Sequence, residues 1–125
     1  MRFEPGDVVL VRFPFTSLGT TKKRPALIVS PREFSTRYGD VVVLALTSRD
    51  QGNDALLLTG WKEAGLLKQT WVKPIVGTIA GDLVERKLGI LGEEDHDRAS
   101  IAIRMLIAEP FGPRPDPQGK KESLR

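Results

Sequence analysis

Short apolar runs, each about as long as a β-strand, fill the first two thirds of the chain and end at Pro, Gly or small polar residues. β-Branched residues dominate these runs, which is typical of strands buried in a sheet. Pro74 lies inside the last run and predicts a bent or edge strand, because proline donates no ladder hydrogen bond. We predict strands over residues 7–13, 25–30, 39–47, 55–59 and 70–79, with one helical turn at 61–67.

The spacing of the apolar positions changes from residue 93 onward. Acidic residues crowd the first turns there, and apolar side chains then recur at intervals of three and four, at Ala99, Ala102, Ile103, Leu106 and Ile107. This pattern predicts an amphipathic helix whose N-terminal acids are favoured by the helix dipole. Four prolines then interrupt a polar segment that cannot bury a core, so the segment is predicted to be disordered.

Five to seven short strands followed by one helix predict a mainly β domain. The natural arrangement is an SH3-like small barrel, or a strongly bent sheet, with the C-terminal amphipathic helix covering one opening. We assign residues 1–109 to this barrel domain and residues 110–125 to the Pro-rich tail. A chain of 125 residues fits one such domain.

The composition excludes several kinds of chemistry. The chain has no cysteine, which removes disulfides and thiol nucleophiles, and its one histidine cannot form a two-histidine acid/base pair. We predict no cofactor and no metal site, although carboxylate-bound Mg²⁺ stays open. No signal peptide and no run approaching the roughly 20 apolar residues of a membrane span are present, so we expect a soluble, cytoplasmic protein without a membrane partner.

The net charge of the chain is too small to indicate nucleic-acid binding by itself. The chain carries +3, but its last segment, residues 110–125, holds four cations against two acids, which is +2 of that total. Residues 1–109 therefore carry only +1. An argument for RNA must rest on where the cations gather.

One basic cluster lies where a polar loop meets the second predicted strand. Lys22, Lys23 and Arg24 stand there, and Pro25 stiffens the backbone that follows. A guanidinium at this point can hold a phosphate through two hydrogen bonds. The alternative is a solvated basic rim, because short Lys/Arg runs are common on surfaces.

A second cluster follows the third predicted strand. Thr47 and Ser48 bring two hydroxyls beside Arg49, although residues of this kind also cap turns. If the second and third strands pair antiparallel, Arg24 and Thr47 fall on the same side of the sheet, where one phosphate can contact both. The two clusters together predict a phosphate-binding, RNA-cleaving site.

The last predicted strand offers a further contact surface. Trp71 and Lys73 are two residues apart, so alternation places them on one face, as a base-stacking ring beside a cation for the RNA backbone. Burial of Trp71 in the core is the alternative.

Five short motifs resemble, in order, the MazF/PemK family of toxin endoribonucleases. The resemblance runs over about residues 5–108 and lies in the segments 6–11 (GDVVLV), 23–30 (KRPALIVS), 46–48 (LTS), 65–72 (GLLKQTWV) and 88–95 (LGILGEED). It implies an SH3-like barrel, a homodimer with RNA at or near the dimer interface, and metal-independent cleavage of single-stranded RNA at short sequences. It also implies a cognate antitoxin, acidic and partly disordered.

The resemblance assigns roles by position. Arg24 matches the family's catalytic arginine and Thr47 its catalytic threonine, while Ser48 and Thr70 stand near the RNA path. Some members carry an acid or amide shortly before the Arg-Pro pair, whereas this chain has Thr21, Lys22 and Lys23. The expected chemistry is attack by the ribose 2′-OH, giving a 2′,3′-cyclic phosphate and a 5′-OH, with the general base unassigned.

Two other functions fit a small barrel. A noncatalytic CcdB-like toxin of the same fold would bind a protein target such as DNA gyrase through an aromatic-bearing end after the helix. A plain SH3-like binding module would need an exposed aromatic groove, which a 6% aromatic content supplies poorly. The CcdB-like function gives no reason for Arg24 and Thr47 to be paired.

Overall fold

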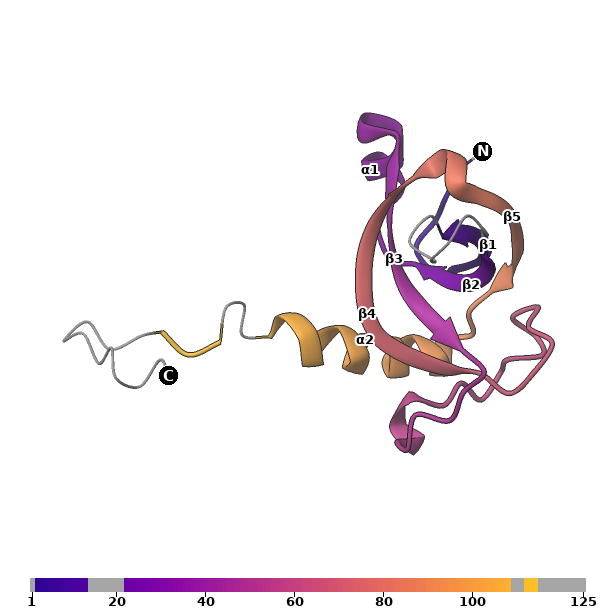
Figure 1. Ribbon diagram of the computed structural model, residues 1–125, viewed down its shortest axis with the longest axis vertical. Coiled ribbons are helices and arrows are strands. Elements are labelled where there is room, and N and C mark those ends of the chain that lie inside the picture. Colours follow the sequence, from indigo (N-terminus) through magenta and orange to yellow (C-terminus); the bar gives the residue numbers. More distant parts are fainter. Residues whose placement is uncertain (1, 14–21, 109–111, 115–125) are drawn as a thin grey trace.

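Five antiparallel strands form one sheet that curls around on itself (Figure 1). The computed structural model describes residues 2–13, 22–108 and 112–114. The strands are β1 (Asp7–Phe13), β2 (Lys22–Ile28), β3 (Asp40–Thr47), β4 (Trp71–Ala80) and β5 (Val84–Ile90). The other elements are the helices α1 (Arg32–Tyr38) and α2 (Glu93–Ile107) and the 3-10 turns η1 (Asp54–Leu56) and η2 (Gly81–Leu83).

The order of the strands in the sheet is β4-β3-β2-β1-β5, so β4 and β5 are its edges. Figure 1 shows the sheet closing into a half-open barrel, with α2 across the end where β3 finishes and α1 at the opposite end. This arrangement confirms the predicted mainly β fold with a C-terminal helix. Pro74 lies on an edge strand, as predicted. The tail predicted to be disordered lies outside the described residues, apart from 112–114.

The core has two parts because the inner strands are buried on both faces. One cluster lies on the concave face of the curled sheet and includes Val9, Val11, Ala26, Ile28 and Val43. The other lies between the opposite face and α2, where leucines of β2 and β3 meet Ala99 and Ala102. Burial on both faces explains why these strands read as almost continuous apolar runs.

Residues 55–59, predicted as a strand, do not form one. The Asn53 side chain accepts a hydrogen bond from Ala55 N at 2.9 Å and caps η1, and Leu57 makes an isolated bridge to Trp71. Leu56 and Leu58 are buried in the cluster that contains α2 residues. The leucine side chains of this run are therefore buried by packing in that cluster, without pairing of the run as a strand.

The apolar pattern predicts neither α1 nor β5. No side chain of α1 is buried, so the helix has no apolar stripe, although Pro31 precedes it and Gly39, with φ of 74°, follows it as helix-boundary signals. β5 pairs with β1 through two register shifts. Such irregularities break the alternation by which a strand is recognised.

A buried carboxylate attaches α2 to the loop before β4. The Asp95 carboxylate, 1% exposed, accepts hydrogen bonds from Thr59 N at 2.9 Å, Thr59 Oγ1 at 3.0 Å and Gly60 N at 2.8 Å. Its neighbours Glu93 and Glu94 are exposed. The sequence pattern groups these acids together, but Asp95 has a structural role.

Two glycines let the loop after Gly60 lie directly on β5. Gly65 has φ of 86°, and a Cβ at this position would come within 2.0 Å of the Leu88 carbonyl oxygen. A Cβ on Gly89 would come within 2.3 Å of the Ala64 carbonyl oxygen. Hydrogen-bonded turns over residues 61–65, including Ala64 N to Gly60 O at 3.0 Å, confirm the predicted turn and complete a wall beside β5.

Candidate functional site

The start of β2 and the end of β3 lie side by side. The two strands pair antiparallel with Ala26 opposite Ala45 and Ile28 opposite Val43. The same register, continued by two residues, brings Arg24 opposite Thr47. Both residues line the same two hollows, as the two sequence clusters predict.

Two hollows share the Arg24 and Thr47 pair in their lining. The Lys73 hollow, about 370 Å³, is lined in addition by Phe13, Ala45, Arg49, Gln51, Lys73 and Ile75. The Leu67 hollow, about 530 Å³, has apolar walls and contains Lys23, Ser48, Leu67, Lys68, Thr70 and Arg86. Arg24, Pro25, Leu46 and Thr47 belong to both.

The lining of both hollows is positive. No carboxylate among the described residues takes part in it, whereas its cations are Lys23, Arg24, Arg49, Lys68, Lys73 and Arg86. Of these six, within the described part of the chain, only Lys23 has an ion-pair partner. The cations therefore gather locally in a chain whose first 109 residues are nearly neutral, which is the arrangement that phosphate groups require.

The Thr47 hydroxyl is oriented by its own turn. Its Oγ1 accepts a hydrogen bond from Arg49 N at 3.1 Å, so the turn-capping role is present. Because that bond occupies an acceptor site, the hydroxyl proton can still be donated to an anion. Capping and anion binding are compatible at this residue.

Lys23 is partly neutralised by Glu85. Lys23 Nζ lies 2.8 Å from Glu85 Oε2, and Arg12 Nε lies 3.6 Å from Oε1. The hydrogen bond from Lys23, reinforced by the charges of Arg12 and Arg86, holds the pKa of Glu85 below its ordinary value. Lys23 is thus less available to a phosphate than Arg24.

This ion pair predicts a pH dependence of stability. A carboxyl whose pKa is lower in the folded state stabilises the fold above its ordinary pKa of 4.5 and loses that effect as the pH falls through the lowered value. We expect the wild type to melt slightly above the Glu85→Gln variant at about pH 7 and to lose that advantage progressively as the pH falls below 4.5. A melting-temperature difference that stays constant across this range would contradict the assignment.

The structure separates the predicted RNA-binding residues into two groups. Those beside Arg24 and Thr47 are Lys23, Ser48, Arg49, Thr70 and Lys73. Lys22 is exposed but lines neither hollow, so the structure does not bring it to the pair. Lys68 and Arg86 line the Leu67 hollow and were not predicted, since Lys68 lies in a loop and Arg86 in the unpredicted β5.

Trp71 belongs to the core. It is 7% exposed and packs in the cluster that includes α2 residues, which leaves no free ring face for stacking and confirms the burial alternative. The prediction of a base-stacking ring beside Lys73 is wrong, because Trp71 is buried and lines neither hollow, while Lys73 is exposed and lines one of them. Among described residues the Trp71 indole N–H has no hydrogen-bond partner.

Fluorescence can check the burial of Trp71. In the Trp61→Phe variant Trp71 is the sole indole, and we expect blue-shifted emission, weak quenching by acrylamide and no change on adding RNA. The Trp71→Phe variant, which keeps the half-buried Trp61, serves as the more accessible control. Quenching of Trp71 by RNA would contradict its place in the core.

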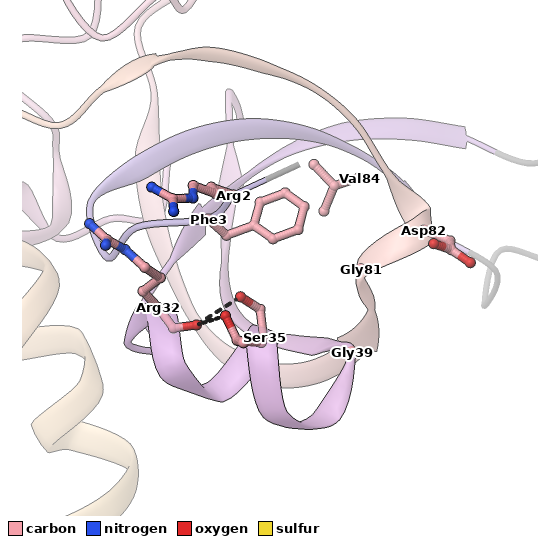
Figure 2. Close-up of a pocket in the computed structure, with 9 residues that line it drawn as sticks. Arg2, Phe3, Arg32, Ser35, Gly39, Gly81, Asp82 and Val84 are labelled. Carbon is pink, nitrogen blue, oxygen red and sulfur yellow. Dashed lines mark hydrogen bonds between the residues drawn. The ribbon is translucent and has the colours of Figure 1, made fainter.

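A further hollow, of about 540 Å³, lies at the opposite end of the sheet (Figure 2). Figure 2 shows Arg2 and Arg32 on one side of Phe3 and Asp82 on the other. Arg32 is already paired with Glu4. This pairing, together with the Asp82 carboxylate, makes the hollow less suited to phosphate than the two beside Arg24.

The described residues contain no group of three or more His, Cys, Asp or Glu side chains that could hold a metal ion. His96 is exposed and lines neither hollow beside Arg24. Within the same ranges, no helix is long and apolar enough to cross a membrane.

One family model and several solved structures match this chain. The family is described as PemK-like, MazF-like toxin of type II toxin-antitoxin system, and its model matches residues 4–107. A mycobacterial endoribonuclease in complex with its cognate antitoxin is 19% identical, with a TM-score of 0.65 over 91% of this chain and 98% of that one. The MazE-MazF structure from Deinococcus radiodurans is 16% identical, with a TM-score of 0.70 over 86% and 98%. Among the curated proteins none matches.

Proposed function

Since the chain belongs to the family of PemK-like, MazF-like toxins of type II toxin-antitoxin systems, we propose that it is a metal-independent, sequence-specific endoribonuclease. Its substrate is single-stranded RNA, mRNA above all, and cleavage in the cytoplasm inhibits translation and growth. The observation that supports the proposal is that Arg24 lies opposite Thr47 in the continued register and that both residues line two hollows with cationic linings.

The proposed reaction needs charge stabilisation more than it needs a strong base. The ribose 2′-oxygen attacks the adjacent phosphorus in line, the bond from phosphorus to the 5′-oxygen breaks, and the leaving oxygen takes a proton to become a 5′-OH. Arg24 stabilises the added negative charge, and Thr47 donates a hydrogen bond to a non-bridging oxygen. A guanidinium with a pKa above about 12 is a poor base, so the proposal names no side chain as the acceptor of the 2′-OH proton.

The flanking residues hold the strand on both sides of the scissile phosphate. Arg49 and Lys73 supply backbone contacts in one hollow, and Ser48 lies along the path in the other. Thr70, 3% exposed, donates its hydroxyl proton to the Lys68 carbonyl and shapes the wall of that hollow instead. Lys22 and Lys23 add attraction at longer range, weakened for Lys23 by Glu85.

Cleavage of RNA in the presence of EDTA tests this function. Purified protein is incubated with a long unstructured RNA, with and without added Mg²⁺, and the products are separated by size. We expect discrete fragments that do not depend on the metal. Intact RNA at high protein concentration would remove the proposal and favour a noncatalytic toxin, while a strict need for Mg²⁺ would remove its metal independence.

The proposal includes two protein partners. We propose that the chain forms a homodimer and is held inactive by a cognate antitoxin that is acidic and partly disordered. Solved structures of similar fold include an endoribonuclease with its antitoxin and MazE-MazF. Light scattering should give about twice the 13.8 kDa chain mass, and a small acidic protein encoded next to this one should abolish cleavage when added.

A further inference from the structure

The two hollows beside the catalytic pair differ in chemistry. Around the Lys73 hollow the added side chains are two cations and an amide, Arg49, Lys73 and Gln51, beside the apolar Phe13, Ala45 and Ile75. The Leu67 hollow adds leucines from β1, β5 and the preceding loop, with hydroxyls and cations at its rim. A nucleobase needs apolar contact as well as hydrogen-bonding groups, and the Leu67 hollow supplies both.

Leu67 is an unusual side chain for such a rim. It is 93% exposed, although its neighbour Leu66 is 8% exposed and anchored in the core. A lone exposed leucine needs no explanation, but this one stands beside Lys68 on the wall of a cation-lined hollow next to Arg24. An apolar group held there can lie against the face of an unstacked base.

The wall that carries Leu67 is fixed from both ends. On one side, Gly65 and Gly89 bring the loop backbone into direct contact with β5. On the other, Thr70 Oγ1 donates a hydrogen bond to the Lys68 carbonyl at 2.8 Å. Because the loop is already ordered, binding a base against Leu67 costs little further conformational entropy.

Arg86 faces the same hollow from β5. Leu10 on β1 pairs with it, and both residues line the hollow with Leu88. Within the described part of the chain Arg86 has no ion-pair partner, so its guanidinium is free to donate to acceptors on a base edge.

We propose that the Leu67 hollow is a nucleobase subsite, in which Leu67 packs on one unpaired base next to the scissile phosphate and Arg86 hydrogen-bonds its edge. Arg49 and Lys73 in the Lys73 hollow hold the strand through its phosphates. This inference rests on the proposed function. It assigns the base preference at one nucleotide to Leu67 and Arg86, and it assigns sequence-independent affinity to Arg49 and Lys73.

Cleavage of a randomised pool of single-stranded RNA, read by sequencing the new ends, tests the subsite. We expect Leu67→Ser to relax the base preference about threefold or more at one position beside the cut. Arg86→Gln should relax the same position about fivefold or more. Arg49→Gln and Lys73→Gln should lower the rate and its salt dependence but leave every preference unchanged.

Two surface variants serve as matched controls. Ile90→Ser and Arg37→Gln change exposed residues outside both hollows and should reproduce the wild-type profile. An unchanged profile in Leu67→Ser and Arg86→Gln, or equal relaxation at all positions, would overturn the subsite. Cleavage by the wild type would still support the proposed endoribonuclease function. Absence of cleavage by the wild type would instead overturn the proposed function, and the subsite with it.

Discussion

Replacing Arg24 with alanine is expected to lower the rate of RNA cleavage by about 10²–10³-fold. The guanidinium is exposed, forms no ion pair with any described residue and stands opposite Thr47 in the continued register of β2 and β3. Its removal takes away the charge that stabilises the transition state but leaves the core untouched. The measurement is the initial cleavage rate of a labelled single-stranded RNA, together with the melting temperature of the variant.

Two further variants separate the role of Arg24 from a general loss of charge. Arg37→Ala removes an exposed arginine on α1, at the other end of the barrel, and should cleave at the wild-type rate. Arg24→Lys keeps the charge but loses the planar fork, so it should recover only part of the rate. A folded Arg24→Ala protein that cleaves as fast as Arg37→Ala would remove Arg24 from the mechanism.

The largest stability effect is expected from Asp95. Asp95→Ala should lower the free energy of unfolding by about 3 kcal/mol, since buried donors on Thr59 and Gly60 lose their acceptor. Urea denaturation followed by circular dichroism measures the change. Asp97→Ala, two residues along the same helix and exposed, is the matched control and should stay within about 0.5 kcal/mol.

The Asp95 variants also distinguish charge from hydrogen bonding. Asp95→Asn keeps one acceptor oxygen but directs an amide toward a backbone donor, so its stability should fall between the wild type and Asp95→Ala. Equal stabilities for Asp95→Ala and Asp97→Ala would show that the contacts with Thr59 and Gly60 contribute nothing measurable.

Those parts of the fold that bury a continuous apolar face could be predicted from the sequence. The runs that became β1, β2 and β3 are buried in the sheet, and α2 packs Ala99 and Ala102 against the same core. β4 is mostly exposed along its middle, and Leu106 and Ile107 of the predicted apolar stripe are exposed. α1 buries no side chain and β5 is interrupted by register shifts, so neither has a periodic signal. Leu56 and Leu58 led to the wrong prediction of a strand, because a short apolar run has the same pattern whether it is buried in a strand or against a helix.

The candidate site followed the same division. Arg24 and Thr47 were predictable because antiparallel pairing of two strong strands brings their ends together. Arg86 was not, since it depends on the weakly patterned β5. For Trp71 the sequence left stacking and core burial open, and the structure buries it. The sequence does not distinguish Asp95 from the other acids of the first turn, because its role depends on hydrogen bonds from the distant Thr59.

The chemistry of the product ends tests the central claim most directly. A single-stranded RNA oligonucleotide containing one mapped cleavage site is incubated with the purified protein in EDTA, beside the same oligonucleotide with a 2′-deoxyribose on the 5′ side of that site. Mass spectrometry should find a 2′,3′-cyclic phosphate and a 5′-OH from the first and no cleavage of the second. Cleavage of the 2′-deoxy substrate, or products with a 3′-OH and a 5′-phosphate, would contradict 2′-OH attack at the Arg24 and Thr47 pair.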